Sequence, residues 1–535
     1  MAPQERKRRW GRIVLVLGIA MVVLVGAAGA FVVTQKEDDV TNPDVEFREE
    51  PSETPEPAEV EPDAPGKKKT DAVDRFIWAH YGYTRDRRRY LPLKNPPRPP
   101  FREIWQYQGN ILLEFPPVIG GKRLFLLNDS GVLYSIDKHT GRVQWKRRLG
   151  ALAAASPAYE QGKVYVVLLQ RRMRGPDSQV GRVVALDART GKIDWSRELA
   201  SRSESSPLVA DGRLYFGSEN GTVYAMDARD GDVRWRFRAD GAVKGGLALA
   251  DGKLYLGAYG GSVYAIRQSD GSQVWRASSS GGAFGLGAGN FYSTPAVAYG
   301  RVYIGSTNGR MYSFSADSGK VAWSRSTGGY VYASPAVAAV PGERPTVYAG
   351  SYSGRFYAWD ARSGSERWSR GGYGRISGGA TVIGDIVYFA DLGNKKTIGL
   401  GARSGRTVFR HERGSYNPVV SDGETIYLTG YHAMYALQPL TAADKQARRK
   451  AKRARVARQR NDRRVCARRA RAAHRGSKPA IRRSYRRCIE RRPERRRAAI
   501  RAVCRKRAKQ AHRGREGRVS RSYRNCVRER NAQRR

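Results

Sequence analysis

The sequence predicts an all-β fold, an eight-bladed β-propeller, with an N-terminal transmembrane helix and a basic C-terminal tail that can form helices. Three observations lead to this prediction. A unit of about 40 residues recurs through residues 101–440, and an uncharged apolar run occupies residues 13–33. The last segment, residues 441–535, carries 39 basic and 6 acidic side chains. A chain of 535 residues is also too long for one ordinary domain.

Residues 1–12 and 13–33 are expected to form a basic cytoplasmic segment and a transmembrane signal-anchor. The apolar run would be about 31 Å long as a helix, close to the roughly 30 Å of a hydrocarbon core. Basic residues Arg6 to Arg12 precede it, so the positive-inside rule places the N-terminus in the cytoplasm and the rest outside. Cleavage near Ala28-Gly29-Ala30 is an alternative that also exports the chain. We expect a single-pass cell-membrane protein whose propeller and tail are extracytoplasmic.

An acidic, proline-rich segment follows at residues 34–66, and a lead-in segment at 67–100. The acidic segment has few large apolar side chains, so it cannot bury enough surface to offset the entropy of ordering. We therefore expect residues 34–66 to be an extended linker.

The unit at residues 206–235 illustrates the repeat of the middle domain. Turn pairs such as Asp211-Gly212 and Asp230-Gly231 supply the backbone conformations that tight hairpins require. Apolar residues occupy nearly every strand position, so both faces of each small sheet are covered. Four strands in roughly 40–45 residues are typical of a propeller blade. The expected strands lie near Leu208–Ala210, Arg213–Gly217, Val223–Asp227 and Val233–Phe237.

The number of blades follows from the two ends of the repeat. The last unit, residues 417–439, has three strands and no closing tryptophan, whereas residues 102–107 form a lone strand bearing Trp105. Joined, they make one blade and close the ring without a free edge. Seven full units precede that composite blade, and each ends in an aromatic residue: Trp145, Trp195, Trp235, Trp275, Trp323, Trp368 and Phe409.

The repeated phrase resembles that of pyrroloquinoline-quinone (PQQ)-type propellers. It reads Gly-x-Val-x-Ala-Leu-Asp-x-x-Thr-Gly-x-x-x-Trp from Gly181 to Trp195, and Trp78-x3-Gly82 looks like the opening of such propellers. The family contains PQQ-dependent dehydrogenases, BamB-type scaffold lipoproteins and extracellular sensor modules. The resemblance implies the eight-bladed fold, and we expect the BamB-like, non-enzymatic branch.

No catalytic, cofactor-binding or metal-binding residue is predicted, so we expect no enzyme activity and no cofactor. The resemblance implies that a quinoprotein holds PQQ in the axial channel against a disulfide of adjacent cysteines, yet residues 101–440 contain no cysteine. The tryptophans recur in register and are expected to pack blade against blade. Four aspartates also recur in register, where an Asp-x-x-Thr/Ser-Gly turn explains them: Asp137, Asp187, Asp227 and Asp360.

Two sets of residues are candidates for binding. Polar residues before proline open the innermost strands and could ring the axial channel, either as ligand contacts or as turn and water-bridging groups. The insertions at 170–181 and 281–292 are candidates for partner recognition. The polar residues of the first set are Ser156, Ser206, Thr294, Ser334 and Asn417.

The tail contains a duplication, because residues 465–489 align without a gap with residues 503–527 at an offset of 38. Each copy carries two cysteines placed symmetrically about a turn, as an α-helical hairpin would require. We predict local disulfides, since export places the thiols in an oxidising setting. A zinc site of Cys-x7-His-x13-Cys type is the alternative. The predicted pairs are Cys466 with Cys488 and Cys504 with Cys526.

These features predict a membrane-anchored extracytoplasmic propeller that acts as a binding or scaffold module for envelope proteins or anionic surface polymers. Its basic tail is expected to bind polyanions. A PQQ-dependent dehydrogenase is one alternative, and a nucleic-acid-binding protein that acts through the tail is another, although export argues against nucleic acid. We expect a monomer.

Overall fold

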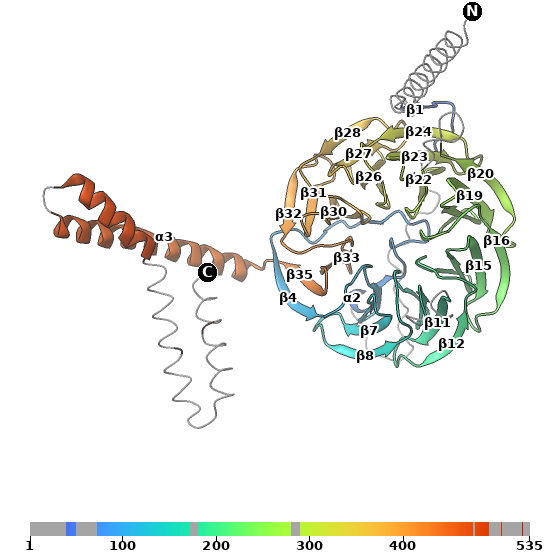
Figure 1. Cartoon of the computed structure of the whole chain (residues 1–535), viewed down its shortest axis with the longest axis horizontal. Helices are drawn as coiled ribbons and strands as arrows, with labels where there is room; N and C mark the ends of the chain where they lie inside the picture. The colour runs from blue at the N-terminus through green and yellow to red at the C-terminus, as the bar shows by residue number, and fades with distance from the viewer. Residues whose placement is uncertain are drawn as a thin grey trace, which may run out of the picture. The chain divides into compact units, whose positions relative to one another are not determined.

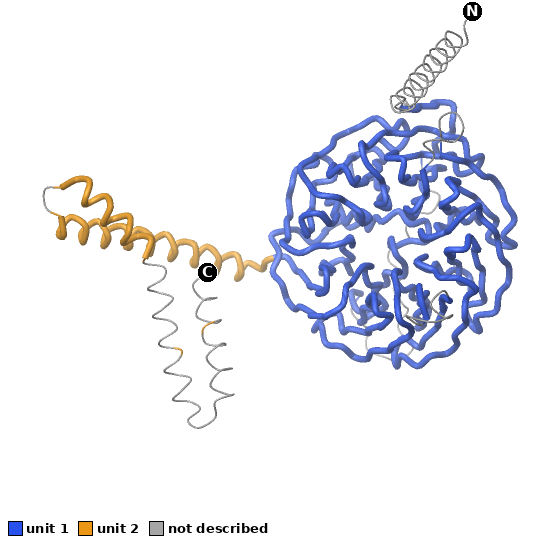
Figure 2. The backbone as a smooth tube through the Cα atoms, viewed as in Figure 1, with its two compact units in different colours: residues 1–439 blue, residues 440–535 orange. Residues whose placement is uncertain are grey.

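The computed structural model describes residues 39–49, 72–171, 180–279, 289–474 and 477–491, with residues 504 and 527. The chain divides into two compact units, residues 1–439 and 440–535 (Figure 2). The described part of the first unit is almost wholly β, and that of the second is helical.

The first unit is a ring of eight antiparallel blades of four strands each (Figure 1), which confirms the predicted propeller. In seven blades the strands follow chain order, and the first strands of several successive blades contact one another around the axis. The strands of blades 1 to 4 are β5 (Val118–Gly120), β6 (Arg123–Leu127), β7 (Val132–Asp137), β8 (Val143–Arg148); β9 (Ala158–Glu160), β10 (Lys163–Leu168), β11 (Arg182–Asp187), β12 (Ile193–Glu198); β13 (Leu208–Ala210), β14 (Arg213–Gly217), β15 (Thr222–Asp227), β16 (Val233–Arg238); β17 (Ala248–Ala250), β18 (Lys253–Gly257), β19 (Ser262–Arg267) and β20 (Gln273–Ser278).

The eighth blade closes the ring. Its outermost strand, β4, comes from the start of the propeller and pairs with the last strand, β35, so that Trp105 lies opposite Ala436. The lone N-terminal strand therefore completes the blade, as the sequence predicts. The strands of blades 5 to 8 are β21 (Ala296–Ala298), β22 (Arg301–Gly305), β23 (Arg310–Ser315), β24 (Val321–Ser326); β25 (Ala336–Ala338), β26 (Thr346–Gly350), β27 (Phe356–Asp360), β28 (Glu366–Arg370); β29 (Thr381–Ile383), β30 (Ile386–Asp391), β31 (Lys396–Gly401), β32 (Thr407–His411); β33 (Val420–Ser421), β34 (Ile426–Thr429), β35 (Ala433–Pro439) and β4 (Phe101–Gln108).

The recurring tryptophan and glycine hold neighbouring blades together. Trp145 donates a hydrogen bond from Nε1 to the carbonyl oxygen of Ala188 in the next blade, at 3.1 Å. Its ring also covers Gly191, whose φ is +70° and where an added Cβ would lie 2.7 Å from the indole. The packing role expected for the tryptophans is therefore observed. The same contact of tryptophan on glycine recurs at Trp105–Gly141, Trp195–Gly231, Trp235–Gly271, Trp275–Gly319, Trp323–Gly364 and Trp368–Gly405.

Part of the expected linker packs on the propeller instead of extending into solvent. Strand β1 (Val40–Thr41) pairs with the outer strand β24 of blade 5, and the segment continues across that blade as far as residue 49. Phe47 stacks on Tyr299 with ring centroids 5.4 Å apart, and Arg48 forms ion pairs with Asp251 and Asp317. Residues 39–49 pack on the propeller because the blade supplies partners that the local composition does not reveal. Residues 50–71 lie outside the described part of the chain.

The lead-in segment adds three short elements to the ring. Helix α2 (Ala72–Arg75) precedes β2 (Ile77–Trp78), which pairs with β5 of blade 1. Strand β3 (Tyr90–Leu91) pairs in parallel with β29 of blade 7. Between β2 and β3 the chain crosses the centre of the ring (Figure 1).

In the second unit, α3 (Ala442–Ala473) begins with a capping box, in which Thr441 and Asp444 each accept a hydrogen bond from the other's backbone N–H. Residues 478–491 form another helical stretch. Among the described residues, none of the helices has the length and apolar character needed to cross a membrane. The anchor expected at residues 13–33 lies outside them.

Candidate binding face

The lead-in segment occupies the axis of the propeller. The first strands of blades 1 and 7 pair with β2 and β3. In this way residues 77–91, which we call the axial hub, satisfy the inner edges of the sheets, where backbone groups would otherwise lack partners. Between β2 and β3 single hydrogen bonds join the hub to the first strands of blades 2 to 6: Ala79–Tyr159, His80–Val209, Arg85–Leu249, Asp86–Val297 and Arg88–Val337.

Arg87 lies at the centre of the hub with no exposed surface. Its Nε donates to the carbonyl oxygen of Leu247 at 2.8 Å, and its Nη2 donates to that of Pro207 at 3.1 Å. Burial lowers the pKa of the Arg87 guanidinium to about 9, so the group is still charged at neutral pH. The nearby Arg89 is equally buried, and its guanidinium lies 4.6 Å from the centroid of the Tyr81 ring. Two arginine side chains therefore fill the axis.

The connections between strands define two faces of the ring. In an antiparallel blade, the segment entering the first strand and the hairpin between the second and third strands lie at the same end. We call the face formed by these ends the loop face. The hairpins between the first and second strands, and between the third and fourth, form the opposite face.

The polar residues expected to ring the channel lie buried at the loop face, and several of them link neighbouring blades. The backbone N–H of Ser156 donates to Ser206 Oγ at 3.0 Å, and that of Thr294 donates to Ser334 Oγ at 3.1 Å. Asn417 donates from Nδ2 to the carbonyl oxygen of Leu113 at 2.9 Å. These contacts give the side chains a structural role between blades.

A small cavity of about 60 Å³, the axial mouth, opens at the loop face beside these residues. Tyr81 of the hub contributes to its lining, so the hub closes it on the side of the axis. Ser206, Thr294, Ser334 and Asn417 line it, whereas Ser156 does not. Its other polar and aromatic lining includes Glu114, Glu204, Lys244, Tyr292, Tyr332 and Tyr416.

Lys244 is the centre of an ion-pair network at one side of the mouth. Its Nζ lies 2.6 Å from Glu204 Oε1 and 3.0 Å from Glu219 Oε1. Burial tends to lower the pKa of Lys244, but the two carboxylates outweigh it and the pKa is raised. Tyr292 donates its hydroxyl to Glu204 Oε2 at 3.0 Å, which joins the network to an aromatic cluster.

Five tyrosines form a continuous cluster across blades 4 to 6 at the loop face. Ring centroids lie 6.2 Å apart for Tyr259 and Tyr292, 5.5 Å for Tyr292 and Tyr332, and 4.9 Å for Tyr332 and Tyr352. Tyr330 contacts both Tyr332 and Tyr352 and is 53% exposed. Tyr330 is the exposed member of this tyrosine cluster, and the other four are half-buried.

Two carboxyl groups, Glu114 in the lining of the mouth and its neighbour Asp129, have no charged partner among the described residues. Burial, with the charges of Asp129 and Glu204, raises the pKa of Glu114 to about 7. Burial raises the pKa of Asp129 to about 6, and its Oδ1 is buried without a hydrogen-bond partner.

Comparison with known proteins agrees with this geometry. A family model described as outer membrane protein assembly factor BamB matches residues 102–182, 176–242 and 219–454, more than half of the chain. The chain belongs to the BamB family. No curated protein matches it in sequence.

Solved structures resemble this BamB-family chain in fold. BamB from Moraxella catarrhalis is 17% identical with a TM-score of 0.50, covering 63% of this chain and 99% of its own. A quinohemoprotein alcohol dehydrogenase from Pseudomonas putida is 16% identical with a TM-score of 0.58, covering 70% and 83%. The computationally designed protein Ika8 is 13% identical with a TM-score of 0.52, covering 63% and 98%. At these identities the likeness extends to the fold alone.

The axis of this BamB-family propeller does not fit PQQ. Arg87 and Arg89 occupy the channel in which a quinoprotein would hold its cofactor, and the axial mouth encloses only about 60 Å³. Pockets for small organic ligands are usually roughly 300–1,000 Å³. The propeller also lacks the cysteines of the adjacent-cysteine disulfide.

The repeated aspartates belong to turns, as the sequence indicates. Asp187 Oδ1 accepts hydrogen bonds from the backbone N–H and the hydroxyl of Thr190, which lower the pKa of Asp187. Asp137 and Asp360 accept the same pair from Thr140 and Ser363. Across the described residues no group of three or more histidine, cysteine, aspartate or glutamate side chains is placed to hold a metal ion.

The two insertions are only partly described. Most of 170–181 and 281–292 lies outside the described residues, but Tyr292 belongs to the tyrosine cluster. The hub and the carboxylates of the mouth were not predicted from the sequence. The sequence signal for the hub was the arginine-rich lead-in segment. The signal for the mouth was the position of Glu114 in the connection that enters blade 1.

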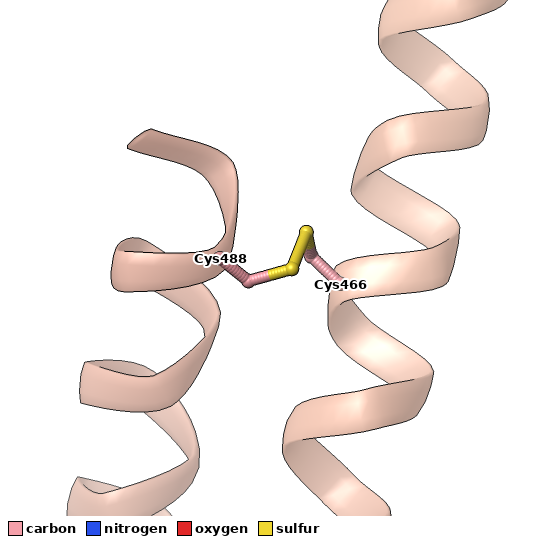
Figure 3. The surroundings of a disulfide bond; sticks show 2 residues. All are labelled: Cys466 and Cys488. Atoms are coloured by element: carbon pink, nitrogen blue, oxygen red, sulfur yellow. A yellow bond between two sulfur atoms is a disulfide. The ribbon is translucent and has the colours of Figure 1, made fainter. Parts of the chain in front are cut away.

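The tail carries the local disulfide that its duplication predicts, between Cys466 and Cys488 (Figure 3). The bond joins α3 to the helical stretch at 478–491 and excludes the zinc alternative for this copy. Cys504 is also disulfide-bonded, whereas Cys526 lies outside the described residues. In α3 a row of basic side chains shares one face of the helix: Arg449, Lys452, Arg453, Arg460 and Arg464.

Proposed function

We propose that the protein is a membrane-anchored extracytoplasmic binding or scaffold module, and that its loop face holds envelope proteins or polymers. The observation that carries this proposal is the axial hub. Because residues 77–91 fill the channel, binding surface is left at the loop face rather than inside the ring. Loops positioned by a rigid scaffold are common sites of recognition.

The tyrosine cluster supports a protein partner. Tyrosine combines a large apolar ring with a polar hydroxyl, and it is enriched in protein interfaces. Tyr330 is exposed, while Tyr332 and Tyr352 are half-buried and fixed by contacts with their neighbours. A partner would therefore meet an ordered surface.

The segment at 39–49 supports a short tether to the membrane. It follows the expected anchor after only residues 34–38, which can span on the order of 20 Å. Asp39 forms an ion pair with Arg310 at 3.1 Å. Contacts between this segment and blade 5 therefore begin at residue 39, the first residue described. The propeller would then stay close to the membrane.

The basic tail would add an electrostatic contact with anionic surface polymers. The row of basic side chains from Arg449 to Arg464 makes one face of α3 positively charged. Arginine binds phosphate and carboxylate groups through several donors at once. Nothing in this role requires a specific sequence of the polymer.

Two measurements test the proposal, one in intact cells and one on the full-length protein in detergent. Formaldehyde crosslinking of intact cells, followed by affinity purification, should recover the same envelope partner repeatedly from wild type, and less of it from Y330A/Y352A. Reconstitution with PQQ and calcium should give no saturable quinone absorbance and no dye reduction. Quinone-dependent turnover, or a partner retained fully by the double variant, would contradict it.

A further inference from the structure

We propose that the axial mouth binds an arginine side chain presented by a peptide segment of a partner protein. The inference rests on the proposed function, because it names the chemistry by which the loop face would hold a partner. It is argued from the charge of the mouth, its aromatic lining and its size.

A surplus of negative charge lies at the mouth. Glu114 lines the cavity, and Asp129, in a neighbouring connection of the loop face, lies close enough to act on its charge. Neither carboxyl group has an ion-pair partner among the described residues. Asp129 Oδ1 is moreover a buried acceptor without a donor. Burying a carboxylate without a counter-charge is costly, so a cation arriving from solvent would be stabilised here.

The lysine already present cannot fill this role. Lys244 Nζ is held at 2.6 Å from Glu204 and 3.0 Å from Glu219, and Arg202 also contacts Glu219 at 3.3 Å. These side chains form a network of their own on the blade 3 and blade 4 side. Glu114 therefore has no counter-charge within the described part of the chain.

Aromatic rings complete a site for an organic cation. Tyr292, Tyr332 and Tyr416 line the same cavity as Glu114. Cations already lie over tyrosine rings around the mouth, because Lys244 is 5.4 Å from the Tyr259 centroid and Arg375 is 5.9 Å from that of Tyr352. Cation–π attraction of this kind is strongest when the cation is partly desolvated.

The size and chemistry select arginine among cations. About 60 Å³ admits the end of one side chain and excludes a folded element. A guanidinium is planar, stacks on aromatic rings and binds a carboxylate through two donors at once. An ammonium is a compact point charge that lacks this planar, two-donor geometry. Glu114 and Asp129 also fall short of the three ligands expected of a metal site, and no such group occurs among the described residues.

A pair of matched probes tests the proposal on the full-length protein in detergent. The first is a fluorescein-labelled peptide of alternating glycine and arginine, and the second has citrulline in place of arginine. Citrulline keeps the shape and loses the charge. Fluorescence anisotropy should give at least tenfold tighter binding for the arginine probe.

Matched variants locate the binding. E114Q/D129N should weaken the arginine probe at least tenfold, whereas D211N/D232N, which removes two exposed carboxylates from the opposite face, should change it less than twofold. Y332L should weaken binding and Y332F should not. Thermal unfolding of each variant checks that the propeller is intact.

Equal binding of the two probes, or equal effects of the two double variants, would overturn the proposal. Such a result would leave the proposed function standing if Y330A/Y352A still loses its partner in cells. If the arginine probe showed no preference and Y330A/Y352A also kept its partner in cells, both the arginine site and the proposed function would be contradicted.

Discussion

The indole ring of Trp145 covers Gly191 so closely that a Cβ on the glycine would lie 2.7 Å from the ring. Trp145 ends blade 1, and Gly191 belongs to the turn before the last strand of blade 2. The same contact recurs from blade to blade, so one residue pair explains two fixed positions of the repeat and the rigidity of the ring.

The first prediction concerns that contact. G191A should lower the free energy of unfolding by roughly 2–4 kcal/mol, because the new Cβ meets both a positive φ and the Trp145 ring. Gly162 is a matched control, since its φ is +78° and nothing lies within 4 Å of its Cβ position. G162A should cost about 1 kcal/mol by the same urea titration. Equal losses would show that the indole contact contributes nothing.

The second prediction concerns the axial hub. R87M should destabilise the propeller by about 3 kcal/mol or more, because four backbone carbonyls lose a buried charged donor. R85M removes only partly exposed ion pairs at 3.4 and 3.6 Å and should cost less than about 1 kcal/mol. Thermal melts of the two variants make the comparison, and a stable R87M would mean that the hub is dispensable.

The third prediction concerns Glu114 and pH. The groups around it, Asp129, Glu204, Tyr292 and Tyr416, supply no positive charge. With the pKa of Glu114 raised to about 7, the folded state holds a proton that the unfolded state releases near pH 4.3, so stability falls as pH rises between these values.

E114Q removes this dependence. The difference in melting temperature between E114Q and wild type should be near zero at pH 4. At pH 8, E114Q should melt at the higher temperature. E412Q, which removes an exposed carboxylate directly after the outer strand β32, should show no such trend. A constant difference across pH would mean that Glu114 ionises normally.

The fourth prediction concerns the tail. Binding of polyphosphate to the full-length protein should weaken by roughly tenfold or more between 50 and 200 mM salt, because many counterions are released together. Deletion of residues 441–535 should abolish binding, and substitution of Asn461, an uncharged neighbour of the basic row, should not. Salt-insensitive binding would argue for a specific site instead.

The propeller was predictable because its signals are local and repeated. Trp, Gly and Asp recur in register, and the lone strand bearing Trp105 matches the incomplete last unit. The Cys466–Cys488 pair was predictable for the same reason, since the duplication marks it twice. The hub was not, because Arg87 contacts Leu247 across 160 positions and belongs to no repeat.

The binding face needed the structure for a related reason. Glu114 and Glu204 lie far apart in the sequence and meet only when the ring closes. The segment at 39–49 reads as linker by composition, yet Asp39, Arg48 and Glu49 find charged partners on the propeller. Local composition cannot reveal partners that are supplied by distant parts of a chain.

Site-specific photocrosslinking in intact cells tests the central claim most directly, which is that this propeller binds through its loop face. A benzophenone amino acid at Tyr330, 53% exposed in the tyrosine cluster, is compared with one at Val408, 45% exposed on the outer strand β32. We expect a discrete crosslinked envelope partner from position 330 and none from position 408. Partners captured only from position 408, or equally from both, would contradict it.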